Sequence, residues 1–164
     1  MNLKNVTLIF VLSYLTWLAL NWSVQADVLI TGAVISLLIG LLLCRQCTVL
    51  QNVRLTPKSF AYAIAFVGVF WWELLKSNID VALRVLNPAL PINPGIVEVK
   101  TSLKTNIGKM LLANSITLTP GTLTVDIRED RLFIHWIDVS STNIEEATRA
   151  IVSKFEKYLE VMYG

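Results

Sequence analysis

Charged residues are distributed unevenly along this chain, and that distribution most constrains its fold. The first 70 residues contain only five charged side chains, namely Lys4, Asp27, Arg45, Arg54 and Lys58, and most of the others follow residue 94. Hydrophobic residues make up 54% of the chain and charged residues 16%, whereas soluble chains average roughly 45–50% and ~25%. With a mean hydropathy of +0.60, the sequence predicts a membrane protein with an apolar N-terminal part and a polar C-terminal part.

The first apolar segment runs from Val6 to Trp22 and contains no charge. As a helix it would be roughly 26 Å long, close to the ~30 Å hydrocarbon core of a bilayer. Its end carries Trp17 and Trp22, an arrangement typical of membrane interfaces. A cleaved signal peptide is the alternative, but a second apolar run begins soon afterwards, at Val28. We therefore expect a membrane helix over residues 6–22.

The second apolar segment, residues 28–44, carries small residues at four-residue spacing. Gly32, Ser36 and Gly40 would form one stripe along a helix, and such stripes let another membrane helix approach closely. Chance placement of glycines in apolar filler is the alternative. The sequence favours a helix-packing role for the three residues.

The third apolar segment, residues 60–76, is rich in aromatic residues and continues as a helical pattern to Leu86. Asp80 and Arg84 lie four residues apart on one side of that continuation, as helical ion pairs do. Three prolines within residues 87–95 end it. We expect a membrane helix that emerges and continues along or above the interface. Residues 1–86 are thus predicted to hold two to three membrane helices, followed by a linker at 87–95.

The positive charges give conflicting evidence on membrane orientation. Arg45, Arg54 and Lys58 place the loop after the second segment in the cytoplasm. If the third segment then crosses the membrane, the C-terminal part lies outside. Lysines at 76, 100, 104 and 109, together with Arg84, favour the cytoplasmic side instead. Either the third segment lies partly in the interface, or the charge bias is too weak to orient the chain.

Residues 96–164 are predicted to form a small domain with the order βαββα. Val97 and Val99 alternate with polar residues as in a half-buried strand, and a helical stretch follows from about Thr105. Two alternating stretches, 120–130 and 131–140, predict a hairpin that turns at Glu129 and Asp130. The last stretch begins with a capping pattern at Thr142 or Asn143 and carries an apolar stripe. The chain as a whole is therefore predicted to be an α+β membrane protein.

Two motifs connect this organisation to a known family. The stretches "NPALPINPGIVEVKT" and "LLANSITLTPGTLTVDI", followed by "HWIDV" and a C-terminal amphipathic helix, resemble the E subunit of the Mrp-type multisubunit cation/proton antiporters, also known from the Mnh and Pha systems. The resemblance covers essentially the whole chain. Its most specific part is the core "ANSITLTPGT", which contains Asn114, Ser115, Thr117, Thr119, Pro120, Gly121 and Thr122.

The resemblance implies an accessory subunit of a complex in the bacterial cell membrane that exchanges Na⁺, or K⁺, for protons and so serves pH homeostasis. It implies large complex-I-like antiporter subunits as partners, and a C-terminal domain in the cytoplasm. The implied role is in assembly and ion exchange, without transport by this subunit alone. Two alternatives stay open: the homologous subunit of a membrane-bound hydrogenase-type complex, and a membrane-anchored regulatory or binding module.

Glu73 and Asp80 are the candidate ion-route residues. An ionisable side chain at the end of an apolar helix is costly unless it pairs or meets water, so it is a functional hypothesis by default. Glu73 also has Lys76 three residues away, and a simple interfacial ion pair between them is the alternative that the spacing favours.

The other candidate groups favour structural roles. The threonine hydroxyls of residues 117–124 are more economically explained by hydrogen bonds within a bend than by cation binding. His135, the single histidine, is expected on the surface of a strand. Cys44 and Cys47 have CxxC spacing, but one such pair at a membrane boundary is weak support for metal or redox chemistry.

The sequence contains no nucleotide-binding, zinc-protease or hydrolase motif. The net charge of +2, without a basic run that contains aromatic residues, does not indicate nucleic-acid binding. We therefore expect neither an enzyme nor a cofactor.

Overall fold

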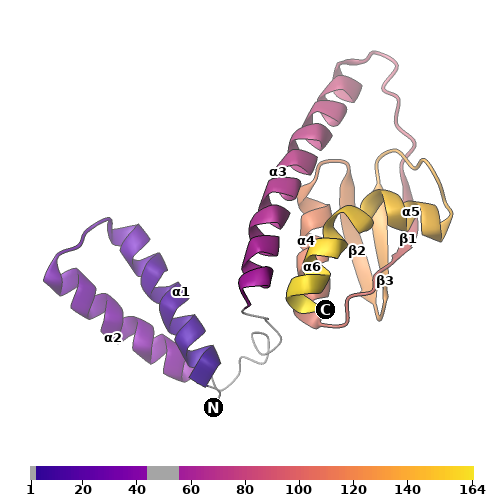
Figure 1. The fold of residues 1–164 in the computed structure, drawn as a ribbon. Coiled ribbons are helices and arrows are strands. Elements are labelled where there is room, and N and C mark those ends of the chain that lie inside the picture. Colours follow the sequence, from indigo (N-terminus) through magenta and orange to yellow (C-terminus); the bar gives the residue numbers. More distant parts are fainter. Residues whose placement is uncertain (1–2, 44–55) are drawn as a thin grey trace. The chain divides into compact units, whose positions relative to one another are not determined.

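A computed structural model describes residues 3–43 and 56–164, which form six helices and three strands in that part of the chain. They divide into two compact units, Met1–Gln51 and Asn52–Gly164. Figure 1 shows the helices of the first unit and the mixed helix and sheet structure of the second. The first unit and the long helix of the second contain the most apolar sequence.

The first unit is a pair of helices, α1 (Leu3–Asn21) and α2 (Ala26–Leu43), joined by a short loop. The ring nitrogen of Trp17 donates to the carbonyl of Val28 at 3.0 Å, which ties the loop end of α1 to the start of α2. The many exposed leucines, isoleucines and valines on both helices suit an apolar solvent, since a water-soluble hairpin would present polar residues there.

Among the described residues, two helices are long and apolar enough to cross a membrane, α2 and α3 (Pro57–Leu86). The apolar stretch of α1, Asn5–Asn21, is slightly shorter than a full span. The structure thus agrees with the expected apolar helices before a small mixed domain.

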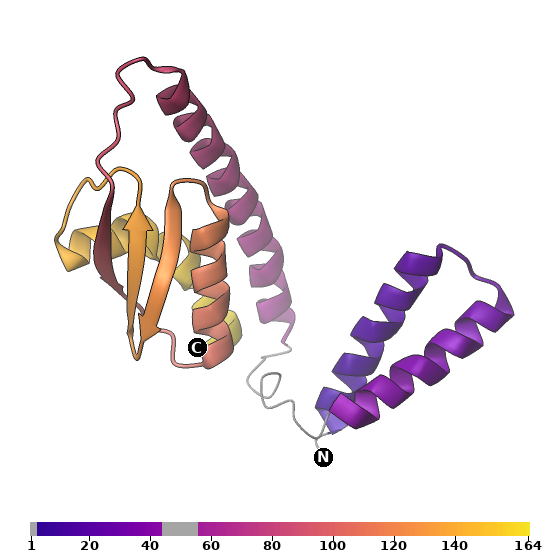
Figure 2. The same cartoon turned by 180° about the vertical axis from the view of Figure 1, so that it is seen from behind.

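The second unit begins with α3 and continues as β1 (Gly95–Lys100), α4 (Asn106–Leu118), β2 (Thr122–Arg128), β3 (Arg131–Trp136), α5 (Ile144–Ile151) and α6 (Ser153–Tyr163). The strands form an antiparallel sheet in the order β1-β3-β2. The predicted hairpin is confirmed, with β2 and β3 meeting at the pair Arg128 and Arg131. In Figure 2, seen from behind, α5 and α6 lie behind the sheet and α4 stands beside β2 at its edge.

The helix boundaries follow from identifiable caps. Thr56 accepts from the amide of Ser59 at the start of α3, with Pro57 in the first turn. Thr105 accepts from Gly108 at the start of α4, and Asn143 accepts from Glu145 and Glu146 at the start of α5. The helix start expected near Thr105 is therefore found, and of the two capping candidates it is Asn143 that caps α5.

The core of the second unit lies between the sheet and its helices. Fully buried side chains from β1, α4, β3, α5 and α6 meet there, including Val99, Leu112, Leu132, Ile134 and Phe155. Tyr62, Ala63, Phe66 and Phe70 of α3 pack against the same core. The structure therefore groups α3 with the α+β domain, whereas the sequence placed a boundary at 87–95 and assigned residues 60–76 to the membrane region.

Two further features differ from the sequence expectation. The C-terminal helix, expected to be continuous, is divided at Val152 into α5, which packs on β1, and α6, which packs on α3 and α4. The strand β2, expected to alternate buried and exposed residues through Leu123, Val125 and Ile127, leaves all three exposed. The half-buried positions of β2 are instead Thr122, Thr124 and Asp126. β2 is an edge strand with a register shift between Thr124 and Asp126.

Candidate functional site

A polar cavity of about 370 Å³ lies between α3 and the α+β domain. Its walls come from the second half of α3, from the segment that joins α4 to β2, from the end of β3 and from α6. Six charged side chains line it: Glu73, Lys76, Asp80, Arg84, Asp138 and Lys154. Both candidate ion-route residues and the last part of the family motif therefore border one cavity, although they are distant in sequence.

Glu73 connects α3 to α6. Its carboxylate accepts from Lys76 at 2.6 Å on its own helix and from Lys154 at 3.0 Å on α6, and its side chain is 12% exposed. The pair with Lys76 is the one that the spacing favoured. The second lysine comes from 81 residues further along the chain. Glu73 is thus held by two cations at the boundary between the two elements.

Arg84 forms the second ion cluster of the cavity. Its guanidinium donates to Asp80 through two nitrogens, at 2.7 and 3.2 Å, and to Asp138 at 2.8 Å. It also donates to the carbonyl of Pro91 at 2.7 Å. A forked, two-point contact of this kind fixes geometry as well as charge. Arg84 therefore fastens the end of α3 to the linker and to the end of β3.

The family motif forms the wall between these two clusters. Thr119, Pro120, Gly121 and Thr122 line the cavity. The hydroxyls of Thr119 and Thr122 each donate to the carbonyl of Ile116 at 2.7 Å. The same carbonyl accepts from the backbone amide of Thr119 at 3.2 Å, and the residue four positions on, Pro120, has no amide hydrogen to donate. The threonines thus terminate α4 and direct the chain into β2.

Gly121 is required by the backbone at this turn. Its φ is +91°, a region that residues with a Cβ rarely adopt. Its carbonyl accepts from the amide of Ile137 at 2.8 Å. A Cβ at this position would lie 3.0 Å from the Ile137 side chain and 3.7 Å from Val81 of α3. The Pro-Gly turn is therefore pressed between β3 and α3.

The remaining motif residues lie on or just after α4, away from the cavity lining. Asn114 is exposed, Ser115 donates to the carbonyl of Leu111, and the Thr117 hydroxyl accepts from the amide of Thr124 at 3.1 Å. The Thr124 hydroxyl donates to the carbonyl of Ala113. The hydroxyls of Ser115, Thr117 and Thr124 thus make local hydrogen bonds along the junction of α4 and β2.

Electrostatically, the cavity lining is balanced. The carboxylates Glu73, Asp80 and Asp138 face the cations Lys76, Arg84 and Lys154, and each carboxylate has a cationic partner. A metal ion bound at one of them would have to displace a lysine or an arginine. Within residues 3–43 and 56–164, no group of three or more metal-ligating side chains is close enough to hold an ion. The arrangement is suited to joining elements.

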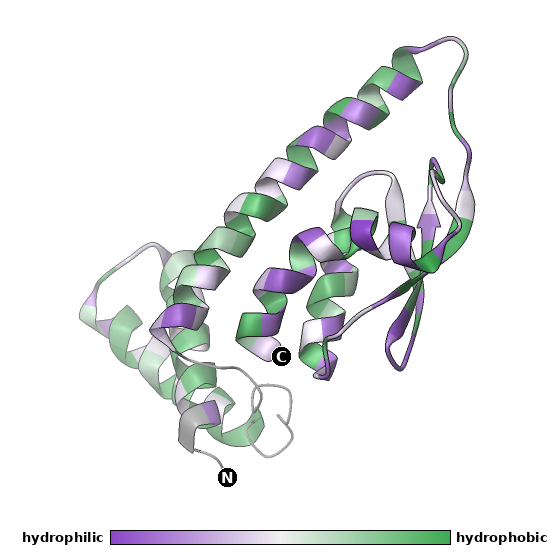
Figure 3. Cartoon of the chain, turned by 45° about the vertical axis from the view of Figure 1, so that its right-hand side comes forward, coloured by the Kyte–Doolittle hydropathy of each residue, from purple (hydrophilic) through white to green (hydrophobic). Residues whose placement is uncertain are grey.

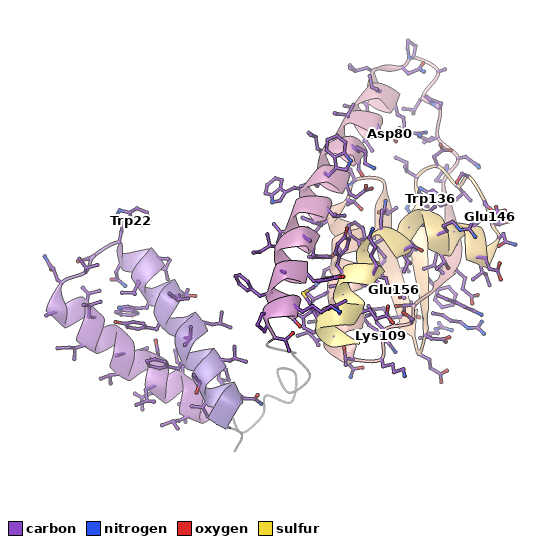
Figure 4. All side chains as sticks on the ribbon, in the orientation of Figure 1. Trp22, Asp80, Lys109, Trp136, Glu146 and Glu156 are labelled. Carbon is purple, nitrogen blue, oxygen red and sulfur yellow. The ribbon has the colours of Figure 1, made fainter. Side chains whose placement is uncertain are left out.

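Figure 4 labels two residues of the cavity lining, Asp80 on α3 and Trp136 at the end of β3. Sequence reasoning identified Glu73, Asp80 and Arg84, but not Asp138 and Lys154. Asp138 lies in the "HWIDV" stretch of the resemblance, but nothing there marks it as a site residue, and Lys154 lies in no motif. Only the fold brings them within reach of α3.

In the first unit, the small-residue stripe faces α1. Gly32, Ser36 and Gly40 are buried. A Cβ at Gly32 would collide with the ring of Trp17, and one at Gly40 would lie 3.3 Å from the carbonyl of Val6. Because the side chains are absent or short, the backbones of α1 and α2 approach closely.

The remaining candidate groups are the histidine and the two cysteines. His135 is exposed on β3, on the face of the sheet opposite the buried Ile134. Cys44 and Cys47 lie outside the described residues.

Comparisons with known proteins match nearly the whole chain. The family model described as "MNHE: Na+/H+ ion antiporter subunit" matches residues 10–162. A relative from Staphylococcus haemolyticus, the E1 subunit of a Na⁺/H⁺ antiporter, is 36% identical over 159 residues, covering 93% of this chain and 92% of that protein. A relative from Alkalihalophilus pseudofirmus, the E subunit of a Na⁺/H⁺ antiporter, is 46% identical over 96 residues, 57% of this chain and 60% of that protein.

A solved structure shares both the fold and the sequence. It is a chain of the membrane-bound sulfane sulfur reductase, described as an archaeal respiratory membrane complex, with a TM-score of 0.84 and 46% identity. The match covers 96% of this chain and 98% of that chain. The resemblance found in the motifs is thus confirmed over the hairpin and the α+β domain together: the chain belongs to the family of Na⁺/H⁺ antiporter E subunits.

Proposed function

We propose that this chain is an accessory subunit of a multisubunit membrane complex that exchanges Na⁺ for protons, and that it holds the complex together without carrying ions alone. The observation that carries the proposal is the family match over residues 10–162, which includes both units. A full-length relative of solved structure is itself part of a membrane complex. The partners proposed are the other subunits, including large complex-I-like antiporter subunits.

The composition of the helical hairpin supports an accessory role. Residues 3–43 contain two charged side chains, Lys4 and Asp27, and each lies in the first turn of its helix. A proton or Na⁺ route through a bilayer requires polar or ionisable groups at depth. The hairpin has no such charged group near its centre, so the ions are proposed to cross through other subunits.

The solved relative favours a second setting for the same subunit. That relative belongs to a respiratory complex, so this chain is also a candidate for an energy-converting complex that contains an antiporter-type module. Na⁺ is the cation proposed first, because the curated relatives carry it in their names. K⁺ is the second candidate, and flux measurements with each cation distinguish them.

The α+β domain is proposed to lie on the cytoplasmic side of the cell membrane. Lys100, Lys104 and Lys109 follow the linker closely, and lysines near membrane segments favour that side. The role proposed for the domain is to present a rigid surface to neighbouring subunits. The ion clusters around Glu73 and Arg84 keep α3 in one position on it.

An ion-route role for Glu73 and Asp80 remains a separate prediction. If Glu73 only joins α3 to α6, then Glu73→Gln and Lys154→Met should lower complex yield and ion exchange by similar factors. If Glu73 conducts ions, Glu73→Gln should abolish exchange in a complex of normal yield, while Lys154→Met retains exchange. Asp80→Asn and Asp138→Asn make the same distinction at Arg84. Similar losses of yield and exchange in both variants would indicate a joining role, whereas loss of exchange in Asp80→Asn alone, at normal yield, would indicate an ion route.

Purification of the tagged chain in mild detergent from its own host tests the proposed function. Recovery with large antiporter-type subunits is the expected result, and additional redox subunits would identify the respiratory setting. Recovery of the chain alone, or with a soluble partner only, would contradict the proposal and favour a membrane-anchored binding module.

A further inference from the structure

We propose that α3 lies in the plane of the membrane surface, with its exposed apolar face in the lipid headgroup–acyl boundary and the α+β domain carried on its other face. Residues 57–86 would then anchor the domain without crossing the bilayer. The proposal uses the membrane attachment of the chain but does not depend on which complex contains it.

The two faces of α3 differ sharply in charge. At 3.6 residues per turn, its five charged residues fall within about 80° of the helix circumference. These residues are Lys58, Glu73, Lys76, Asp80 and Arg84. The opposite side carries exposed apolar residues along the whole length of the helix: Phe60, Ile64, Val67, Trp71, Leu75, Ile79 and Leu86. Figure 3 shows this division as hydrophilic and hydrophobic colours that alternate around α3. A helix of this kind is amphipathic, as helices that lie in an interface are.

The α+β domain occupies the charged side of α3 from its beginning. Tyr62 contacts Tyr158 with ring centroids 6.2 Å apart, and Phe66 and Phe70 contact Phe155 at 6.3 and 6.4 Å. Glu73 and Arg84 continue the contact to Lys154 and Asp138. Packing therefore extends over most of the helix and leaves no length of α3 that lipid alone could surround.

A transmembrane position for α3 would place α6 in the hydrocarbon. Within residues 153–160, α6 carries four charged side chains, Lys154, Glu156, Lys157 and Glu160. Each charge at the centre of a bilayer costs about 2.5–3.5 kcal/mol on insertion scales. Detaching the domain would instead expose the aromatic contacts and break both ion clusters. A position at the surface requires neither change.

The exposed face has the composition of a membrane interface. Trp71 is 64% exposed and Trp72 is 60% exposed, and tryptophan is the residue most characteristic of the headgroup region. Asn78 interrupts the apolar face, but its amide nitrogen donates to the carbonyl of Leu74 at 2.7 Å, which lowers the cost of placing it near lipid. Lys58 and Lys76 lie at the border of the face, from where long side chains reach the headgroups.

Chain connectivity favours lipid as the occupant of this face. Thr56 follows Leu43, the last residue of α2, by only thirteen positions, a distance of at most about 45 Å in a fully extended chain. If α1 and α2 form a membrane hairpin, the start of α3 therefore stays near the bilayer surface. When the α+β domain points toward water from that position, the apolar face of α3 points toward the lipid.

An in-plane α3 also removes the conflict in the charge pattern. Arg45, Arg54 and Lys58 precede or begin α3, and Lys100, Lys104 and Lys109 follow it. The positive-inside tendency places both groups in the cytoplasm. This is possible only if the chain does not cross the membrane between them, as an in-plane helix predicts.

Spin-label depth measurements test the proposal. In the full chain with its copurifying subunits, in phosphatidylethanolamine–phosphatidylglycerol vesicles and with Cys44→Ser and Cys47→Ser as background, nitroxides would be attached singly at residues 60, 64, 67, 75 and 79. Accessibility to oxygen and to a soluble nickel chelate gives the depth of each. A label at Leu38, exposed on α2, is the control inside the bilayer, and one at Lys104 is the control in water.

The proposal predicts that all five labels have a similar, shallow depth, between those of the two controls. A depth that increases toward the middle of α3 and then decreases would show a transmembrane helix and overturn the proposal. Labels shielded from both oxygen and nickel chelate would show that a protein subunit covers the face, which would overturn it as well. If the proposed function is wrong, the large antiporter-type subunits will not copurify with the chain, whatever the depth of the labels.

Side-specific labelling in cells provides a second test with surface substitutions that leave packing unchanged. Gln25→Cys lies in the loop between α1 and α2, and Ser102→Cys lies after β1; both positions are exposed. An in-plane α3 predicts that a membrane-impermeant maleimide labels residue 25 in intact cells and residue 102 only after the membrane is opened. Labelling of both residues from the same side would contradict the proposal.

Discussion

At the scale of single residues, Gly121 shows how the family motif constrains the fold. The turn after α4 needs a positive φ, and the resulting backbone brings Gly121 against Ile137 and within reach of Val81. Only glycine fits both the conformation and the space. The motif is thus explained by a requirement for a sharp turn between two packed elements.

We predict that Gly121→Ala destabilises the protein by about 1–2 kcal/mol, because it adds backbone strain and a close contact with Ile137. Gly68→Ala is the matched control. A Cβ at Gly68 meets no atom within 4 Å, and alanine is the better helix former by about 0.5–1 kcal/mol. Thermal unfolding in detergent should lower the Tm of the first variant only. Equal Tm values would contradict the structural reason given for the motif.

Glu73 is the residue at which a structural and a transport role are most easily separated. We predict that Glu73→Gln and Lys154→Met each lower stability by about 1 kcal/mol, since each removes a charge-assisted bond between α3 and α6. Lys76→Met should cost less, because it removes only a pair within α3. Urea unfolding of the three variants checks this order. A larger loss for Lys76→Met would contradict the bridging role.

At the scale of elements, the junction between α4 and β2 depends on two threonine hydroxyls that bond to one carbonyl. We predict that Thr119→Val lowers stability by about 0.5–1.5 kcal/mol, the net value of one hydrogen bond, because the carbonyl of Ile116 loses the Thr119 hydroxyl but keeps the Thr122 hydroxyl and the Thr119 amide. Thr117→Val should change it by less than about 0.5 kcal/mol, because Thr117 is exposed and water replaces its hydroxyl. Hydrogen exchange at the end of α4 measures the difference. Equal protection in the two variants would rule out the cap.

The packing of α1 on α2 gives a second prediction at this scale. Gly32→Leu and Ser36→Leu should separate the two helices, because both positions are buried against α1. Val34→Leu, at an exposed position of α2, is the control. We expect the first two variants to reduce the yield of intact complex several-fold and the control to leave it unchanged. Similar yields from all three would remove the packing role of the stripe.

The sequence predicts helices and strands better than it predicts which other elements they pack against. Capping residues, alternation in β1 and the turn at Glu129 and Asp130 are local signals, and the corresponding elements are found. Hydropathy, in contrast, reports the content of a helix but not what each face contacts. Residues 60–76 have the hydropathy of a membrane segment, and α3 is long and apolar enough to cross a membrane. Hydropathy did not indicate that Phe66, Phe70 and Glu73 pack on α6.

The candidate site shows the same limit. Glu73, Asp80 and the Thr119–Thr122 turn carry signals in the sequence, as a charge beside apolar residues and as a Pro-Gly motif. Asp138 lies in the quoted "HWIDV" stretch and Lys154 in no motif, and nothing local indicates the partner of either, because their contacts are 54 and 81 residues away in sequence. The division of the C-terminal helix at Val152 carries no signal either, since its apolar stripe runs through both halves. The two halves pack on different elements, α5 on β1 and α6 on α3 and α4.

At the scale of the whole molecule, the two units suit different surroundings. The hairpin of α1 and α2 exposes apolar side chains on most of its surface, while the second unit has a closed core and one apolar helix face. In the account proposed here, the hairpin lies among membrane subunits and the second unit rests on the membrane surface. We propose that these two attachments position the subunit against several others.

The central claim is that this chain is needed for ion exchange but does not perform it alone. Na⁺-dependent proton flux in membrane vesicles tests that claim most directly, measured with the complete set of subunits, with all subunits except this chain, and with this chain alone. We predict flux from the complete set only, at least tenfold above the other two preparations. Robust flux from the chain alone, or undiminished flux without it, would contradict the account.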